Sequence, residues 1–538
     1  MYLIGANIIT PLGEGVQQNF EAVMQGEVSV KLHHDKTILP DPFYASLFDD
    51  IPVETFANRF EALCVRCAKR AVEEAQTDTT SERVIFILST TKGNIEALNH
   101  TQSVAQVGLA DSARRIALCF GNNNTSVVVS NACTSGVCAQ ILAMRLLRAG
   151  LYDTAVVIGA DVQSEFIISG FQCLKALSDE PCRPYDAARK GLNLGEAAAC
   201  MVISNKAKRG SLELLTGAVC NDANHISGPS RTAEGSWRVL DEVTKNIDKQ
   251  RIGVVNAHGT ATLYNDEMES LALWRAGLQN IPVNSLKSVF GHTMGAAGIL
   301  ETLLTHYAMT QGIVLPTRNF ETAGTTHSLK VSRSAQAVGQ EKDCFVKLLS
   351  GFGGCNAALV YKLNASGEKR PAQCSEVKTE EKKRIVLSSD NTDLIELYHR
   401  YAADYPKFLK MDVLSKVGFM AAEMLARQQP LREDCSVLIF THSGSLQNDL
   451  RYQQTIGSFP SPALFVYTLP NIVTGEIAIR HHLLAETSCY LLPEEDWTLM
   501  QQIAKATFCE KPNKQMLCGW VETGTDTFYA DMRLIERL

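Results

Sequence analysis

The sequence predicts an α/β protein built from more than one domain. Strand-like and helix-like segments alternate along the chain, and the strand-like segments are continuously apolar. Such strands are typical of sheets that helices cover on both faces. The chain is 538 residues long, which exceeds the usual size of a single hydrophobic core and favours two or more domains.

The predicted elements follow one another in a regular order. A helix is expected over 60–75, and the apolar run at 83–90 predicts a buried strand. A strand at 125–130 then leads directly into a helix over 133–150. The same apolar pattern predicts further strands at 153–161, 195–204, 252–258 and 344–354.

A polar and charged segment over 364–383 divides the chain. Few large apolar side chains occur in it, so we expect a flexible linker between residues 1–363 and a C-terminal region, 384–538. The C-terminal region repeats features of the beginning of the chain, because Ile116-Ala117 aligns with Ile477-Ala478. This similarity predicts a duplicated half-domain, and chance similarity between two α/β segments is the alternative.

The duplicated half lacks the cysteine that the first half carries. The offset of 361 residues that places Ile116 on Ile477 also places Cys133 on Glu494, and Gly159 aligns with Gly519 at an offset one residue shorter. A carboxylate is a weaker nucleophile than a thiolate and cannot replace it, so we expect 384–538 to be non-catalytic and to bind either the rest of the chain or a partner.

Composition and charge argue against several classes of protein. The chain has 51 basic and 58 acidic residues, a net charge of −7, which does not fit nucleic-acid binding or a polybasic membrane patch. No apolar run approaches the ~18–20 residues that cross a bilayer, and the N-terminus lacks the basic start of a signal peptide. The 16 cysteines are scattered through apolar segments, with one CxxC spacing at Cys64 and Cys67, and no secretory signal accompanies them, so we expect reduced thiols, no metal site and a cytoplasmic location.

Cys133 stands in the sequence NACTSG, where an apolar strand ends and a helix begins. The free N–H groups at a helix N-terminus stabilise a thiolate, and the small neighbours Ala132, Ser135 and Gly136 leave space around the sulfur. Cys133 is therefore a candidate nucleophile. The alternative is a small buried apolar residue, which is the usual role of a free cysteine.

Three further motifs place chemically active residues at predicted strand ends. His258 lies in HGTATLYND, directly after an apolar strand, and Lys287 and His292 lie in KSVFGHTMGAAG. Phe352 lies in GFGG, where glycines allow backbone N–H groups to point at a developing oxyanion. A histidine beside Gly and Thr at the carboxyl edge of a sheet is well placed for chemistry.

In this order, the four motifs resemble those of the elongating β-ketoacyl–acyl-carrier-protein synthases of the thiolase superfamily. The likeness spans about residues 1–363. It implies a five-layer α-β-α-β-α sandwich made of two similar halves, about 1–205 and 206–363, with 384–538 as an added α/β half-domain that resembles a degenerate N-terminal half. It also implies a homodimer, or a heterodimer with a related synthase subunit.

The resemblance implies a role for each motif. Cys133 would accept an acyl group from acyl-carrier protein, while the N–H groups of Cys133 and Phe352 bind the oxyanion. His258 and His292 would donate to the enolate that forms when a malonyl group loses CO₂, and Lys287 would pair with Glu269 to hold the site together. The remaining implied residues are Asp266 as structural support, Thr260 and Thr262 on the phosphopantetheine arm, Phe352 as a gate, and Asp222 and His225 beside the acyl pocket.

The resemblance implies no resident cofactor, because the substrates arrive on the phosphopantetheine arm of acyl-carrier protein. Leu192 stands where many relatives carry phenylalanine, which implies a wider acyl pocket.

Two alternatives stay open: an active subunit of a ketosynthase/chain-length-factor heterodimer, and a CoA-dependent thiolase-like acyltransferase with Cys355 as a second cysteine. Fatty-acid, aryl-polyene and other polyketide-type pathways all remain compatible with the sequence.

Overall fold

A computed structural model describes residues 1–51, 58–99, 106–208, 210–364, 377–510 and 513–538. Within these residues, apolar strands and helices alternate as the sequence predicts. Among them, no helix combines the length and the apolar character that a bilayer-crossing segment needs. Every cysteine in the described ranges is a free thiol.

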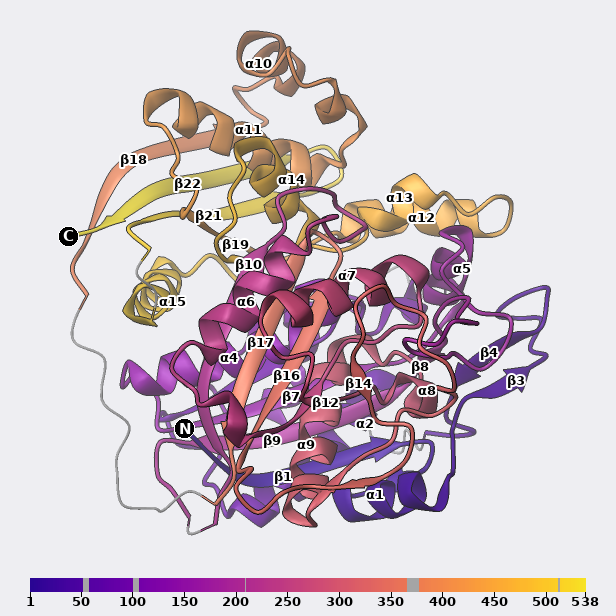
Figure 1. Cartoon of the computed structure of the whole chain (residues 1–538). Helices are drawn as coiled ribbons and strands as arrows, with labels where there is room; N and C mark the ends of the chain where they lie inside the picture. The colour runs from indigo at the N-terminus through magenta and orange to yellow at the C-terminus, as the bar shows by residue number, and fades with distance from the viewer. Residues whose placement is uncertain (52–57, 100–105, 209, 365–376, 511–512) are drawn as a thin grey trace.

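One long sheet runs through the N-terminal half and continues into the C-terminal region (Figure 1). In the N-terminal half, its strands lie in the order β1 (Tyr2–Thr10), β9 (Ala197–Ser204), β7 (Thr154–Asp161), β5 (Val84–Ser89) and β6 (Val127–Val129). From β6 the sheet continues through β20 (Thr487–Leu491), β19 (Ser436–Thr441), β21 (Gln515–Thr523), β22 (Phe528–Arg537) and β18 (Thr379–Ser388).

Counted outward from the junction between β6 and β20, the second five strands repeat the order of the first five. These two strands pair antiparallel, with Val129 opposite Tyr490 and Val128 opposite Leu491. Outward from the junction, β19 matches β5, β21 matches β7, β22 matches β9 and β18 matches β1 in order and direction of pairing. The two halves of this sheet are therefore related by a pseudo-two-fold axis within one chain.

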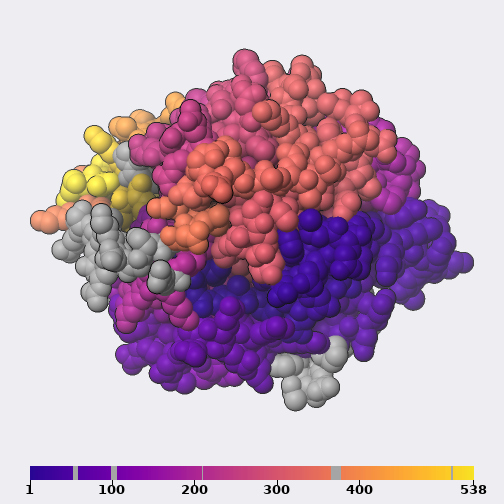
Figure 2. All heavy atoms as spheres, turned by 60° about the horizontal axis from the view of Figure 1, so that its bottom comes forward, coloured from indigo at the N-terminus to yellow at the C-terminus, as the bar shows by residue number. Residues whose placement is uncertain are grey.

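A second sheet is separated from the first by a layer of helices. Its strands are ordered β10 (Glu213–Asn221), β17 (Cys355–Lys362), β16 (Cys344–Gly351), β11 (Ile252–Asn256), β12 (Pro282–Asn284) and β14 (Lys330–Val331). Seen from below, the indigo N-terminal segment packs directly against the orange segment around residues 300–350 (Figure 2).

Helices form three layers around the two sheets. The middle layer holds α4 (Ser135–Arg148) and α9 (Ala297–Thr310), which are buried on nearly every side and contact both sheets. The outer layers hold α2 (Arg59–Ala75) and α3 (Leu109–Leu118) on the first sheet, and α6 (Glu234–Thr244) and α7 (Leu263–Arg275) beside the second. The predicted five-layer α-β-α-β-α sandwich is confirmed.

The C-terminal region extends these layers. Helix α15 (Trp497–Glu510) packs against α4 in the middle layer, while α11 (Val413–Gln428) and α14 (Ile472–His481) cover the outer face of the continued sheet. Apolar side chains from both regions share one core, including Leu142, Leu146, Tyr490, Met500 and Ile503. The region therefore packs against the rest of the chain, one of the two outcomes expected from the sequence.

The predicted linker, 364–383, extends too far along the chain, because part of it belongs to a strand. Strand β18 begins at Thr379, so its first five residues occupy the end of that segment, and residues 365–376 lie outside the described part of the chain. The charged residues that suggested a linker, among them Glu380, Glu381, Lys383 and Arg384, are exposed on this edge strand. Exposed charges on an edge strand discourage pairing with other chains, so a polar composition here does not exclude a strand.

Candidate active site

A cavity of about 420 Å³ lies where several predicted motifs meet. Cys133 follows strand β6, His258 follows β11, and Phe352 follows β16, so each side chain reaches the cavity from the end of a buried strand. His292 reaches it from the loop after α8 (Lys287–Phe290). This convergence of strand ends is the usual place for a binding site in an α/β protein.

The backbone at Cys133 forms a tight elbow between strand and helix. A 3₁₀ turn, Ala132–Thr134, connects β6 to α4, and Ala132 adopts a φ of 49°, which is uncommon for a residue other than glycine. Hydroxyl groups hold the turn, because Thr134 Oγ1 donates to the Asn131 carbonyl at 2.7 Å and Ser135 Oγ donates to the Ala132 carbonyl at 2.6 Å. The elbow thus presents the Cys133 sulfur to the cavity.

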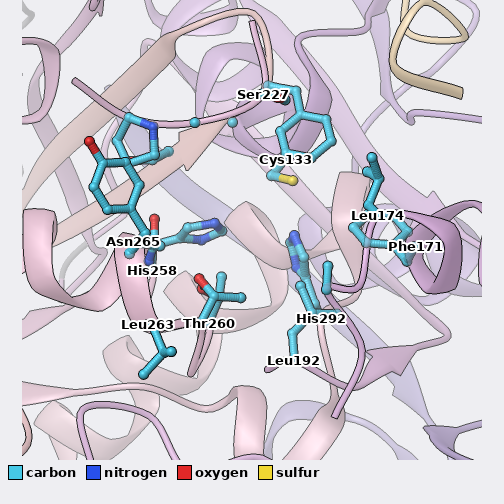
Figure 3. Close-up of a pocket in the computed structure, with 18 of the residues that line it drawn as sticks. Cys133, Phe171, Leu174, Leu192, Ser227, His258, Thr260, Leu263, Asn265 and His292 are labelled. Carbon is cyan, nitrogen blue, oxygen red and sulfur yellow. The ribbon is translucent and has the colours of Figure 1, made fainter. Parts of the chain in front are cut away.

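Two imidazole rings lie beside the Cys133 sulfur (Figure 3). The Cys133 sulfur, one ring nitrogen of His258 and one ring nitrogen of His292 all lie within 4.8 Å of one another. The two rings meet edge to face, with centroids 5.2 Å apart at 81°. Nδ1 of His292 accepts a hydrogen bond from the Met294 N–H at 3.4 Å, so the proton of the neutral ring lies on Nε2. That Nε2 is buried and has no hydrogen-bond partner among the described residues.

Two carboxylates on α7 hold the loop that carries His258. Glu269 accepts from the backbone N–H of His258 at 2.6 Å, from the N–H of Gly259 at 2.8 Å and from the Tyr185 hydroxyl at 2.6 Å. Asp266 accepts from the N–H of Ala261 at 3.2 Å and from the N–H of Tyr185 at 2.7 Å. Both residues therefore lie where the sequence predicts structural support, and they act on the backbone.

The predicted pairing of Lys287 with Glu269 is wrong. Lys287 Nζ lies 2.7 Å from Glu301, whose other oxygen binds Lys347 Nζ at 2.5 Å. Glu269 is occupied by backbone N–H groups, whereas Glu301 projects from α9 between the two ammonium groups. Glu301 and Lys347 were missed because the prediction considered only residues within the four motifs. Each is a lone charged residue in an otherwise apolar element, and that pattern was the available signal.

Burial and the lysine pair set the protonation of the site. Burial lowers the pKa of His258 and of His292 well below the ordinary value, and Lys287 lowers both further, so the rings are neutral at pH 7. Burial also raises the pKa of Cys133 to about 12, although Lys287 opposes this shift. The sulfur faces the cavity, yet the atoms packed around it favour the thiol over the thiolate that the helix N-terminus was expected to stabilise.

The remaining predicted residues divide into those that line the cavity and those that do not. Thr260 and Thr262 line it, with their hydroxyl oxygens 3.0 Å apart. Further lining residues with a predicted role are Phe352, Leu192 and Asp222. The side chain of His225 is exposed, although Ser227, Gly228 and Pro229 of the same loop line the cavity.

The other candidate cysteine and the aligned glutamate lie away from the cavity. Among the cysteines of the described residues, only Cys133 lines it. Cys355 is buried with its sulfur 3.2 Å from Thr134 Oγ1, so it does not supply a second thiol to this site. Glu494 is exposed in the loop between β20 and α15.

The C-terminal region supports the elbow from behind. The side-chain oxygen of Asn131 accepts from the N–H of Cys489 at 2.7 Å, and its amide donates to Ser488 Oγ at 3.3 Å. The N–H of Ser130 donates to the Cys489 carbonyl at 3.2 Å. No feature of the sequence indicated that the strand carrying Cys489 would touch the elbow.

The arrangement combines three chemical capacities in one cavity. A thiol can form a thioester, neutral imidazoles can exchange a proton or donate a hydrogen bond, and a buried cationic pair can favour a developing anion. The glycine-rich turn lies directly against the elbow, because a Cβ added to Gly351 would be 3.2 Å from the Cys133 nitrogen. These capacities suit acyl transfer followed by reaction through an enolate.

Known proteins share both the sequence and the fold of this chain. Residues 3–209 match the family domain described as "Beta-ketoacyl synthase, N-terminal domain", and residues 196–321 match the corresponding C-terminal domain. The 3-oxoacyl-(acyl-carrier-protein) synthase 2 of Vibrio cholerae serotype O1 is 26% identical over 407 residues, covering 66% of this chain and 97% of that protein.

A polyketide relative and a solved structure extend the similarity. The tetracenomycin polyketide synthase ketoacyl synthase alpha subunit of Streptomyces glaucescens is 30% identical over 346 residues, covering 56% of this chain and 80% of that protein. The structure of the PfaC keto synthase–chain length factor covers 100% of this chain and 78% of that chain, with a TM-score of 0.81 and 13% identity. Its likeness in fold therefore includes the C-terminal region. The chain belongs to the β-ketoacyl synthase family and is an acyltransferase.

Proposed function

We propose that this chain condenses an acyl group carried on Cys133 with a malonyl unit, and that acyl-carrier protein delivers both substrates. The observation that carries this proposal is the convergence of Cys133, His258 and His292 within 4.8 Å in one cavity. The name of the Vibrio cholerae relative, 3-oxoacyl-(acyl-carrier-protein) synthase 2, supports the choice of carrier.

In the first half-reaction, the Cys133 sulfur attacks the thioester carbonyl of the acyl carrier. The thiol proton must leave as the new carbon–sulfur bond forms, because the pKa of Cys133 lies at about 12. A neutral imidazole beside the sulfur accepts this proton and returns it to the departing phosphopantetheine thiolate. The backbone N–H groups at Cys133 and Phe352 are the proposed donors to the oxyanion.

In the second half-reaction, the carbon–carbon bond between the malonyl carboxylate and the rest of the thioester breaks, and CO₂ leaves. The electron pair of that bond forms an enolate whose negative charge lies on the thioester oxygen. His292 Nε2–H and the His258 ring donate hydrogen bonds to this enolate oxygen, and the net positive charge of Lys287, Glu301 and Lys347 favours the anion. The enolate carbon then attacks the acyl-Cys133 carbonyl, a carbon–carbon bond forms, and the Cys133 thiolate leaves.

The test is to incubate the chain with an acyl-carrier protein loaded with a defined acyl group and to weigh the intact product by mass spectrometry. The wild-type chain should gain the mass of one acyl group, and Cys133→Ala should gain none and should form no condensation product. Cys119→Ala is the matched control, because Cys119 is exposed but lies outside the cavity. Condensation by Cys133→Ala at the wild-type rate contradicts the proposal.

We also propose that residues 377–538 take the place of a second synthase subunit at the β6 edge. The sequence predicts a homodimer or a heterodimer, and β20 already pairs with β6 within the chain. The solved PfaC structure is named as a keto synthase together with a chain length factor. This name supports the proposal that a partner-like half-domain lies within the same chain. Any further subunit must then bind a different surface.

A further inference from the structure

The turn that carries Phe352 touches the C-terminal region as well as the elbow. Asn471 is 1% exposed, and its side-chain amide donates to the Phe352 carbonyl at 2.8 Å. Asn471 stands at the N-cap of α14, where asparagine ordinarily caps its own helix. Here the side-chain oxygen makes no capping hydrogen bond, and the side-chain NH₂ group donates to the Phe352 turn.

Close backbone packing fixes the same turn. Gly475 of α14 lies against Gly353, and a Cβ added to Gly475 would be 2.6 Å from the Gly353 carbonyl oxygen. The Gly353 carbonyl also accepts from the Asn221 amide at 2.8 Å, and that amide donates to Thr487 Oγ1 of β20 at 2.9 Å. The C-terminal region therefore reaches the turn directly through α14 and indirectly through Asn221.

The position of this turn matters to both walls of the cavity. On one side, Gly351 lies against the Cys133 nitrogen. On the other, the Phe352 ring stacks on Phe171 of α5 (Glu165–Cys173), with centroids 6.4 Å apart at 23°. A shift of the turn would move the Phe352 N–H relative to Cys133 and would move the ring that borders the cavity.

From these contacts we infer that Asn471 is a positioning residue for the acyl site, supplied by a half-domain that carries no nucleophile of its own. The Asn471 amide restrains the Phe352 turn in the arrangement that receives the acyl group, so docking of the C-terminal region completes the site. This inference rests on the proposed function, because it assigns Asn471 to the acylation of Cys133.

The first test replaces Asn471 with leucine, which keeps the branched shape of the side chain at a larger volume and removes the donor. Loss of one hydrogen bond should lower the single-turnover rate of Cys133 acylation about three- to tenfold, without raising the KM for the acyl carrier. Hydrogen–deuterium exchange of a peptide spanning residues 349–357 should become faster. Asn448→Leu is the matched control, because Asn448 is 3% exposed and its amide donates to the Leu464 carbonyl, also at 2.8 Å, within the C-terminal region.

The second test adds a methyl group at the other contact. Gly475→Ala places a Cβ against the Gly353 carbonyl and should slow acylation by displacing the turn, although alanine favours helix α14. Gly457→Ala is its control, since a Cβ there meets nothing within 4 Å.

Three results would overturn the inference: unchanged acylation and exchange in Asn471→Leu, faster exchange with unchanged acylation, or equal losses in the two control variants. Failure of the wild-type chain to acylate Cys133 would instead refute the proposed function. Deuterium exchange in Asn471→Leu would still decide whether Asn471 restrains the turn, and an unchanged rate there would overturn the restraint as well.

Discussion

At the scale of single residues, the site contains strained backbone conformations, which hydrogen bonds to hydroxyl and carboxylate groups stabilise. Ala132, Ala261 and Met294 all have positive φ values, between 46° and 64°. Each lies within two residues of Cys133, Thr260 or His292, and such conformations cost about 1–3 kcal/mol each. The hydroxyl and carboxylate hydrogen bonds to the elbow and to the His258 loop offset this strain and keep the reacting groups in place.

Replacing either histidine should mainly affect decarboxylation, whereas replacing Cys133 should abolish acylation. His258→Ala and His292→Ala each remove one donor to the enolate oxygen, so each should lower decarboxylation of the malonyl carrier ~10²–10³-fold. Acylation of Cys133 should fall less. Release of labelled CO₂ and single-turnover acylation measure the two steps separately, with the exposed His399→Ala as control. Variants that lose acylation alone would disprove these roles.

Lys287 should control the reactivity of the free thiol. The pKa of Cys133 is raised to about 12, so between pH 7 and 9 the thiolate fraction and the rate of alkylation should rise about tenfold per pH unit. The Lys287 charge lowers this pKa, and Lys287→Met should therefore raise it further and slow alkylation at every pH in that range. Iodoacetamide labelling of the Cys133 peptide, followed by mass spectrometry, gives the rate.

Lys190→Met is the control for this experiment. Lys190 also lines the cavity, but its ammonium is half exposed and pairs with Asp179 at 3.2 Å. An exposed charge is screened by water, so its removal should leave the alkylation rate unchanged. A plateau near pH 8.5 in the wild-type chain would show that the Cys133 pKa is not raised.

At the scale of elements, a buried ion pair links α4 to the start of β20. Two nitrogens of Arg145 each lie 2.7 Å from an oxygen of Glu486, and each side chain is 1% exposed. Although burial opposes it, Glu486 raises the pKa of Arg145. Such a pair is destabilising to break, because the remaining charge is left buried with fewer partners.

Glu486→Gln should therefore lower the free energy of unfolding by about 3 kcal/mol, the low end of the usual range, since Glu510 still lies 3.5 Å from Arg145. Replacing both residues, as Arg145→Met with Glu486→Met, should cost less than the single change. Urea unfolding measures both. Lys245→Ala, in an exposed pair with Glu242, should change stability by no more than about 0.5 kcal/mol. A Glu486→Gln chain as stable as that control would contradict the prediction.

At the scale of the whole molecule, one chain contains a pseudo-dimer in which only one half carries the proposed nucleophile, Cys133. The sheet passes from β6 to β20 without a break, and the side chains of α4 and α15 lie in one core. Removal of the C-terminal region would leave the β6 edge unpaired and the α4 face exposed. An unpaired apolar strand edge is a site of aggregation.

A chain that stops after Leu363 should therefore self-associate or precipitate, which light scattering would detect. As a control, a protease site inserted between residues 364 and 377 tests the link without removing the region. The two cut pieces should stay together and keep Cys133 acylation, since the shared core holds them. A truncated chain that remains soluble, with unchanged assembly and full activity, would show that the C-terminal region has no role in either.

The site was predictable from sequence where local chemistry decides the structure. The apolar run before Cys133 and the helical pattern after it fixed the elbow, and the glycines around Phe352 fixed a turn, because strand, helix and turn preferences act over a few residues. The motifs could not assign the partner of Lys287. Buried charges pair with whatever the packing of α8, α9 and β16 brings within reach, and Glu301 lies 14 residues along the chain.

By itself, the sequence determined that this protein has alternating apolar strands and helices, a cysteine at a strand-to-helix elbow, and a second half-domain without that cysteine. Only the tertiary structure decided where the second half binds and what it touches. Its strand β20 pairs with β6, and Asn471 reaches the Phe352 turn. Such contacts join residues more than 100 positions apart, and they depend on which surfaces remain apolar and unpaired after each half has folded.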